Sequence, residues 1–350
     1  MIWLTWRQLR GSAAMLATVL VILAVVLALT GPDLATRYSA GIAACAQDDT
    51  CDRFYNRFFG AYDMPFMAVS LVVLLLPVLI GLFWGAPLIT RELEAGTHLL
   101  VWNQSITRGR WLAAKLGLVG LVAMAAVCLC GLMVSWWSDP LDKSAAESLA
   151  LMAPLVFGAR GIAPMGYAAF AFVLGVTVGM LVRRTVPAMA LTLAVFTAIQ
   201  LAMPLLARAH LMPPVTGTFE LSKANVENLG ISQEGGGPAR ILLRSAVPGH
   251  PGAWVLSSDL VDPSGRTISG GDGEAALQVS TTSGPCSPSG AVGAGGRCMA
   301  EINRLGYRQQ ATYQPLERFW PFQWIETGIY ALLTLGLTWF CFWWIRRRLA

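Results

Sequence analysis

Long runs of apolar residues recur along the chain at lengths typical of membrane-spanning helices. A helix needs about 20 apolar residues to cross the hydrocarbon core of a bilayer. Uncharged stretches of this length lie at residues 11–32, 64–90, 116–138, 161–182, 185–207 and 327–345. The strands of a membrane barrel would instead alternate apolar and polar positions. We therefore predict an all-α polytopic membrane protein with six transmembrane helices.

Two shorter features flank these runs. Residues 1–10 carry Trp3, Trp6, Arg7 and Arg10, a combination typical of an interfacial elbow helix. We expect the apolar run that follows to be retained as a helix rather than cleaved as a signal peptide. The apolar piece 149–157 is too short to cross a bilayer. We expect it to form a surface or re-entrant helix.

The longest polar stretch lies between the fifth and sixth spans. Residues 208–322 carry most of the Gly, Pro and Ser residues and contain short candidate strands at 239–245 and 252–258. Residues 264–296 are rich in Gly and Ser, which favours a mobile loop. We predict a β-rich extracytoplasmic domain at 208–322, inserted between membrane helices at 1–207 and a last helix with a basic tail at 323–350.

Composition supports a membrane location. Of the 350 residues, 55% are hydrophobic and only 13% are charged, and the mean hydropathy is +0.57, which is too apolar for a water-soluble protein. Arginine far outnumbers lysine, and Ala, Gly and Val are abundant, which points to a bacterial plasma membrane. The charges of 208–322 balance, so the sequence shows no footprint for nucleic acid.

Charges in the connections predict the orientation of the spans. One side holds a large excess of basic residues over Glu92 and Glu94. These basic residues are Arg7, Arg10, Arg91, Arg108, Arg110, Lys115, Arg183, Arg184, Arg346, Arg347 and Arg348. Cytoplasmic connections are enriched in Lys and Arg. We therefore expect both termini in the cytoplasm.

The cysteines fall into two groups. Cys45 with Cys51, and Cys286 with Cys298, lie in segments predicted to be outside the cell, where an oxidising environment allows two local disulfides. The alternative is four free thiols. The other three cysteines lie inside spans and are expected to pack there: Cys128, Cys130 and Cys341.

The sequence lacks the motifs of common catalytic and nucleotide sites. It has no H-E-x-x-H, no G-x-S-x-G, no metal-spaced Cys/His set and no phosphate-binding G-x-x-x-x-G-K-[ST] loop. We predict a protein that is not an enzyme and binds no metal or other cofactor itself. Glu326, at the outer end of the sixth span, is the nearest candidate for a pathway residue, although the sequence favours a headgroup-level carboxylate satisfied by water.

A charged segment follows the second span. It runs from Thr90 to Lys115 and reads R-E-L-E-A-G-T-H-L-L from Arg91 to Leu100, followed by S-x-x-R and a lysine. It resembles the coupling segment of the ABC transporter type-2 permease family. The segments 83–87, 161–167 and 319–326 are similar to actinobacterial permeases of this kind. The alternative is that this segment is a charged cytoplasmic loop without a coupling function.

The resemblance implies a function and a set of partners. It implies a coupling helix at about residues 88–104 that docks a separate ATPase subunit, which would bind ATP and Mg²⁺. The docking residues would be Arg91, Glu92, Glu94, Gly96, Thr97 and Trp102. Two copies of the chain would pair in the membrane and export a hydrophobic or amphipathic cargo, such as a drug, an antibiotic, a peptide or a lipid.

Two questions stay open at this level. Pairs of glycines four residues apart, Gly81 with Gly85 and Gly175 with Gly179, let helices approach closely, either between two copies or within one. The chain could instead be a membrane-anchored ligand sensor or assembly factor, whose cytoplasmic segment should tolerate mutation. A third hypothesis is an ABC complex that uses ATP for signalling or lipid handling without efflux.

Overall fold

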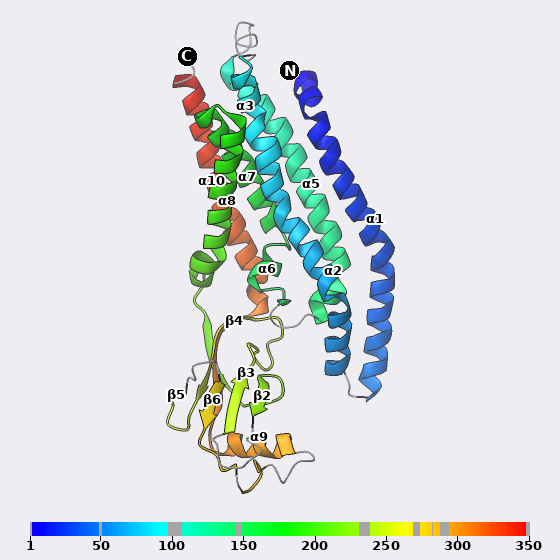
Figure 1. The fold of residues 1–350 in the computed structure, drawn as a ribbon, viewed down its shortest axis with the longest axis vertical. Coiled ribbons are helices and arrows are strands. Elements are labelled where there is room, and N and C mark those ends of the chain that lie inside the picture. Colours follow the sequence, from blue (N-terminus) through cyan, green and yellow to red (C-terminus); the bar gives the residue numbers. More distant parts are fainter. Residues whose placement is uncertain are drawn as a thin grey trace. The chain divides into compact units, whose positions relative to one another are not determined.

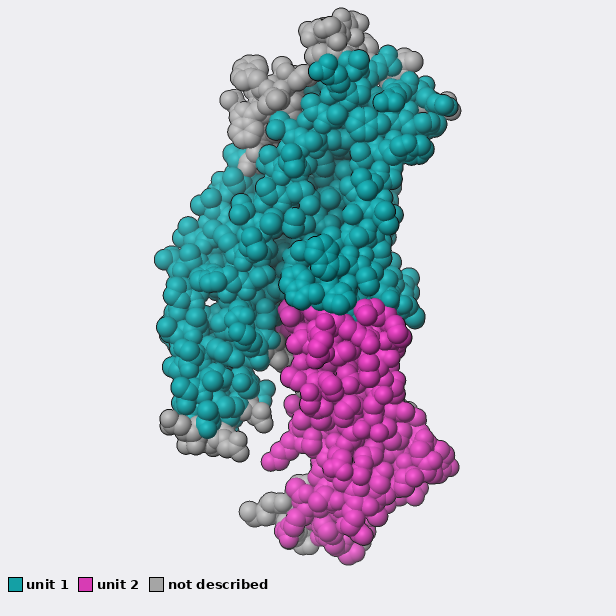
Figure 2. Space-filling model, turned by 180° about the vertical axis from the view of Figure 1, so that it is seen from behind, with its two compact units in different colours: residues 1–146, 154–211, 320–350 teal, residues 147–153, 212–319 magenta. Residues whose placement is uncertain are grey.

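The computed structural model describes residues 2–48, 51–96, 107–144, 149–230, 239–268, 274–281, 283–287 and 294–347. Within these residues, six helices are long and apolar enough to cross a membrane, as the sequence predicts (Figure 1). The chain divides into two compact units (Figure 2). The helical unit contains residues 1–146, 154–211 and 320–350, and the β unit contains residues 147–153 and 212–319.

The helical unit is built from long helices and a few short turns. In chain order, its elements are α1 (Ile2–Asp48), α2 (Cys51–Ile80), the π-helical turn η1 (Gly81–Gly85), α3 (Ala86–Glu94), α5 (Arg108–Ser144), α6 (Pro154–Phe157), α7 (Ala163–Val182), α8 (Thr185–Ala202), the turns η3 (Met203–Ala207) and η4 (Arg208–His210), and α10 (Phe319–Arg347). Helix α7 contacts α2, α3, α5 and α8. Among the six candidate spans α7 is the most deeply buried, so it is the central helix of this unit.

The predicted elbow is not a separate element. Helix α1 runs without a break from Ile2 to Asp48, through the first span. Gly11 is the only strong helix breaker before Gly31 and Pro32, and a lone glycine costs a helix only about 1 kcal/mol relative to alanine. No residue near position 10 is therefore strong enough to break the helix between the predicted elbow and the first span.

The second span passes through a π-helical turn. In η1, the hydrogen-bond ladder widens and the amide of Ala86 donates to the carbonyl of Gly81. Pro87 is the second residue of α3, and a proline lacks the amide proton and clashes with the carbonyl four residues earlier in a regular helix. The wider turn accommodates this proline, so that α2, η1 and α3 continue one another.

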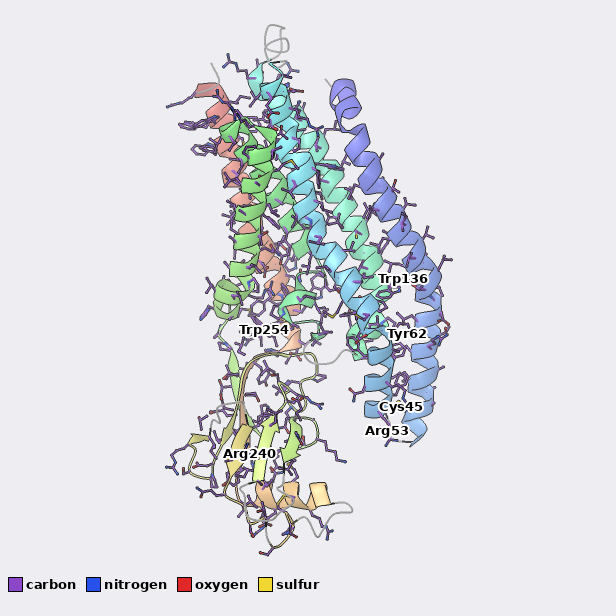
Figure 3. The ribbon with its side chains drawn as sticks, viewed as in Figure 1. Cys45, Arg53, Tyr62, Trp136, Arg240 and Trp254 are labelled. Carbon is purple, nitrogen blue, oxygen red and sulfur yellow. A yellow bond between two sulfur atoms is a disulfide. The ribbon has the colours of Figure 1, made fainter. Side chains whose placement is uncertain are left out.

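Helices α1 and α2 form a long hairpin that ends in a disulfide. Cys45 and Cys51 are bonded, as predicted, and Figure 3 shows Cys45 and Arg53 at the end of the hairpin. Near this bond, Tyr38 of α1 packs against a row of aromatic rings on α2: Phe54, Phe58 and Tyr62. The hairpin is thus held by a covalent bond and by aromatic contacts.

The short apolar piece before α7 does not form the surface helix that was one of its two predicted forms. It contains a single helical turn, α6, whose Val156 and Phe157 are fully buried rather than lying at a surface. Arg160, just after it, is also buried and forms an ion pair with Asp142 of α5 at 3.2 Å. The chain that follows α6 is therefore fastened to α5 inside the helical unit.

The β unit contains two antiparallel sheets and one longer helix. Its elements are β1 (Val215–Phe219), β2 (Val226–Gly230), β3 (Ala239–Leu243), β4 (Trp254–Val261), β5 (Thr267–Ile268), β6 (Glu274–Leu277), α9 (Ala294–Arg304), β7 (Arg308–Gln314) and the turn η6 (Leu316–Arg318). The strand orders are β1-β7-β4-β5 and β2-β3-β6. Strands β3 and β4 match the two candidate strands in the sequence.

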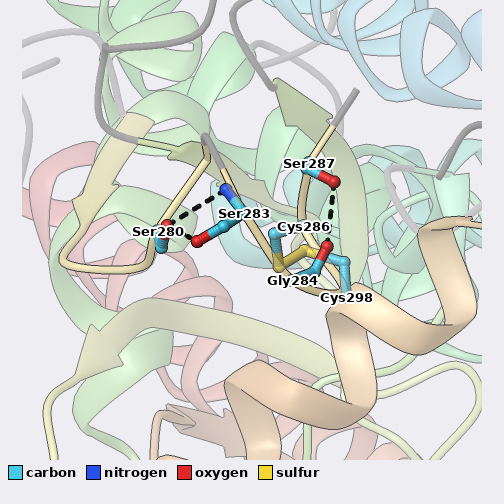
Figure 4. The surroundings of a disulfide bond; sticks show 6 residues. All are labelled: Ser280, Ser283, Gly284, Cys286, Ser287 and Cys298. Carbon is cyan, nitrogen blue, oxygen red and sulfur yellow. Dashed lines mark hydrogen bonds between the residues drawn. A yellow bond between two sulfur atoms is a disulfide. The ribbon is translucent and has the colours of Figure 1, made fainter. Parts of the chain in front are cut away.

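The second predicted disulfide, Cys286 to Cys298, ties α9 to the loop before it (Figure 4). Both cysteines are buried in a core with Ile241 and Leu277. Residues 264–296 are not one mobile loop, because their described part includes β5 and β6. Strand β6 pairs with β3 and buries Ala275 and Leu277, an alternation that its glycine-rich surroundings hide in the sequence.

Candidate functional site

The charged segment after the second span is described as far as Gly96. The described part of the expected coupling helix, at about residues 88–104, belongs to α3: Arg91 to Glu94 form its last turn, and α3 continues the second span. Gly96 has a φ of +66° and its amide donates to the carbonyl of Leu93, so it ends the helix in a conformation that favours glycine. Thr97 and Trp102 lie outside the described residues.

Glu92 points into the helical unit. Its carboxylate lies 2.5 Å from Nζ of Lys115 on α5, and both side chains are almost fully buried. Nζ also donates to the carbonyl of Leu88 at 3.3 Å, and it lies over the ring of Trp111. Removing one partner of a buried ion pair leaves an uncompensated charge, which is strongly destabilising. In this structure Glu92 therefore joins α3 to α5 and does not present its carboxylate at the surface.

Glu94 binds the beginning of α8. One carboxylate oxygen accepts the amide proton of Thr185 at 2.8 Å, and the other accepts its hydroxyl at 2.7 Å. The first amides of a helix have no partner within the helix, and its positive end attracts a negative charge. Thr90, one turn earlier on α3, places its hydroxyl oxygen 3.0 Å from that of Thr185. Helix α3 is thus fixed to α8 as well as to α5.

The other side of α3 is open. Arg91, Glu94 and Ala95 are exposed, while Thr90 and Glu92 are buried. We call Arg91, Glu94 and Ala95 the outer edge of α3. Of these three residues, Glu94 also binds α8, so Arg91 and Ala95 are the outer-edge positions with no described contact that holds α3 in the helical unit.

The four predicted packing glycines meet within one chain. A Cβ added to Gly175 of α7 would lie 2.4 Å from the carbonyl oxygen of Gly81, and one added to Gly85 would lie 2.5 Å from that of Phe172. At Gly179 it would lie 2.8 Å from the carbonyl oxygen of Ala86. The backbones of α7 and of η1 with α3 therefore approach as closely as glycine permits. Of the two alternatives, the structure shows packing inside the subunit.

A comparison with protein-family models connects this site to known proteins. The model described as ABC-2 membrane transporter related matches residues 17–208, which is more than half of the chain and includes all of α3. The chain belongs to this ABC-2-related family. Searches of curated proteins and of solved structures give no significant match to the chain.

A second polar cluster in this ABC-2-related chain surrounds Glu326. The sequence favoured a carboxylate satisfied by water at the membrane surface, and that interpretation is wrong, because Glu326 is fully buried. Arg208 of η4 donates to both carboxylate oxygens, at 2.8 and 2.9 Å. Tyr167 of α7 donates a further, short hydrogen bond. Glu326 therefore joins α10 to α7 and to the end of α8.

Further contacts extend this cluster around α6. The guanidinium of Arg208 lies over the ring of Phe157, 4.1 Å from its centroid, and donates to the carbonyl of Pro154. Gln323 of α10 accepts the amide protons of Ile162 and Ala163 and donates to the carbonyl of Phe157. Residues 154–163 are thus fastened on one side by Arg208 and Gln323, and on the other by the ion pair of Arg160.

Sequence reasoning missed Arg208 as a partner of Glu326. It placed Arg208 in the external domain, although this arginine directly follows the fifth span and Glu326 opens the sixth. Two opposite charges at the same expected level of a membrane are a signal for an ion pair. Among the described residues, no group of three or more His, Cys, Asp or Glu side chains could hold a metal ion.

Proposed function

We propose that this chain is the membrane-spanning permease subunit of an ABC exporter whose ATPase is a separate polypeptide. Membership of the ABC-2-related family and the six candidate spans support this proposal. In the proposed orientation, α3 and both termini face the cytoplasm of a bacterial cell, and the β unit lies outside. The excess of arginine at the α3 end of the spans supports this orientation.

The attachment of α3 to the other helices carries the proposal. Helix α3 is joined to α5 by Glu92 and Lys115, to α8 by Glu94 and Thr185, and to α7 by close backbone packing. Packed helices move as units rather than deforming continuously. A force applied to the outer edge of α3 would therefore move several spans together. An ATPase that closes on ATP and Mg²⁺ would supply this force.

The proposed cargo is hydrophobic or amphipathic. Two copies of the chain would enclose a central pathway, and the spans present many exposed apolar side chains. A polar solute would need fixed polar partners along its path, whereas a drug-like molecule, a peptide with apolar side chains or a lipid would not. Export is the direction that the family resemblance suggests.

Co-purification tests the proposal. The tagged chain is expressed with its neighbouring genes, purified in mild detergent and probed for an ATPase with a phosphate-binding loop. We expect stoichiometric recovery that is lost in Arg91→Glu and in Ala95→Trp, both on the outer edge of α3. Arg57→Glu, an exposed arginine on α2 far along the chain from α3, serves as the matched control and should retain the ATPase.

The opposite result favours the other class of function. If no ATPase is recovered, or if both outer-edge variants retain it as well as the control does, the chain does not work as proposed. A membrane-anchored sensor or assembly factor that acts through the β unit would then be the better description. In that case, ligand binding to the purified full chain becomes the next measurement.

A further inference from the structure

A continuous apolar groove runs along the helical unit between α5 and α10, with α7 as its floor. One half has a volume of about 360 Å³, and the other about 430 Å³. Met124, Ala169 and Thr334 line both halves, so the two halves are one groove. We call the half lined by Ala113 of α5 and Phe342 of α10 the arginine-end half, because each of these residues lies one turn from an arginine.

The groove is as long as the apolar part of a membrane is thick. On α10 its lining runs from Trp324 to Phe342. At 1.5 Å per residue, this stretch measures ~27 Å, close to the ~30 Å of a bilayer's hydrocarbon core. The groove therefore lies at the depth where hydrocarbon chains are found.

The lining of the arginine-end half suits hydrocarbon. Its α5 wall has small residues at Ala113, Gly117 and Gly120, which leave room beside α7. Its hydroxyls belong to Thr334 and Thr338, which donate to carbonyls one turn earlier on α10. With these hydroxyls bonded within the helix and with no charged side chain in the lining, a polar ligand would find no matched partners there.

Both walls of the arginine-end half, α5 and α10, carry an arginine at the same end of the groove. Arg110 precedes Ala113 by three residues on α5, and Arg346 follows Phe342 by four residues on α10. Residues three or four apart lie on the same face of a helix, so each arginine continues a groove-lining face. Both arginines are exposed. An elongated apolar site with two guanidinium groups at its mouth matches a molecule with a hydrocarbon tail and an anionic head.

We propose that the arginine-end half of this groove binds an anionic phospholipid of the surrounding membrane. An acyl chain lies along α7 between α5 and α10, and the phosphate is held by Arg110 and Arg346. The proposal goes beyond the transport function and does not depend on an ATPase or on a cargo. It describes a resident lipid that fills the space between α10 and the rest of the helical unit.

Native mass spectrometry of the purified full chain tests the groove. The chain is delipidated in detergent and given equal amounts of phosphatidylglycerol and phosphatidylcholine. We expect phosphatidylglycerol to be retained roughly tenfold better, because each arginine near a lipid headgroup attracts an anionic lipid. Gly117→Leu should abolish this retention. Gly117 lines the groove and a Cβ there meets no atom within 4 Å, so the added side chain should occupy the space of the acyl chain.

Matched variants separate the groove from general effects. Gly336→Leu makes the same substitution on α10 outside the groove lining, also into open space, and should retain the lipid. Arg110→Gln with Arg346→Gln should bring phosphatidylglycerol down to the level of phosphatidylcholine. Arg184→Gln, an exposed arginine at the turn between α7 and α8, should leave the preference unchanged.

Three outcomes would overturn the proposal. Equal retention of the two lipids by the unaltered chain would show that no anionic head is recognised. Retention by Gly117→Leu as strong as by Gly336→Leu would place the lipid elsewhere. Displacement of the lipid by an equal concentration of water-soluble glycerol 3-phosphate would show that the head, and not the chain in the groove, accounts for binding.

Discussion

Arg208 and Glu326 form a buried ion pair that joins the end of the fifth span to the sixth. Their side chains lie 2.8 Å apart, with exposed fractions of 2% and 0%. We expect Glu326→Gln to lower the free energy of unfolding by about 3–5 kcal/mol, because the charge of Arg208 would stay buried without its partner. The measurement is the unfolding midpoint of the purified chain in detergent.

Two further variants test the cause of this loss. Replacing both partners, as in Arg208→Met with Glu326→Leu, should restore much of the stability, because no uncompensated charge remains. Lys143→Met breaks the exposed pair with Asp139 and should cost less than about 1 kcal/mol. If Glu326→Gln costs no more than Lys143→Met, the pair does not contribute as a buried charge pair.

Residues on the two sides of α3 should behave differently. Glu92→Gln removes the partner of buried Lys115 and is expected to lower the unfolding midpoint of the chain alone. Arg91→Glu alters an exposed position and should leave that midpoint unchanged while reducing recovery of the ATPase. Thermal unfolding and co-purification, measured on the same preparations, separate the two effects. A loss of stability in Arg91→Glu as large as in Glu92→Gln would contradict this division.

Close packing of α7 should make Gly175 intolerant of any side chain. Gly175→Ala places a methyl group within van der Waals overlap of the carbonyl of Gly81, and overpacking of this kind typically costs about 1–3 kcal/mol. Gly328→Ala on α10 has open space and should be neutral or slightly stabilising, because alanine favours the helix. The yield of monodisperse protein and the unfolding midpoint compare the two. Equal behaviour would mean that α7 has room to move.

The disulfide of the β unit should contribute to its stability. Cys286 and Cys298 are buried and separated by 12 residues, and closing a loop of this length stabilises a fold by roughly 3 kcal/mol in the chain-entropy model. Cys298→Ser should therefore unfold the β unit at lower denaturant concentration. Cys128→Ser, which alters a free cysteine of α5, is the control. Labelling of Cys286 by a maleimide in the unreduced native chain would show that the bond is absent.

The spans could be predicted because each depends on a local property. An uncharged run of sufficient length is a helix in lipid whatever its neighbours are, and so α7 and α8 begin within two residues of the expected positions. The disulfides were predictable for a similar reason, since each joins cysteines close in sequence. Strand β6 was missed because its pairing with β3 is visible only in three dimensions.

The buried charges were harder to predict because their partners are distant in sequence. Arg208 and Glu326 are 118 residues apart, and each considered alone predicts a charged side chain at the end of a span. Glu92 belongs to a motif whose family resemblance suggests docking, and nothing in the local sequence shows that Lys115 takes its carboxylate inward. Each position fits two environments when considered alone, and the partner decides between them.

Helix α1 is too long to lie entirely within the hydrocarbon core of a membrane. Its 47 residues span ~70 Å at 1.5 Å per residue, more than twice the ~30 Å thickness of the hydrocarbon core. Much of α1 must therefore stand in water or among headgroups, where lipid cannot shield its backbone from competing hydrogen bonds. There the hairpin with α2 must follow the rules of soluble proteins. Urea should loosen this hairpin at concentrations that leave the membrane-embedded helices intact.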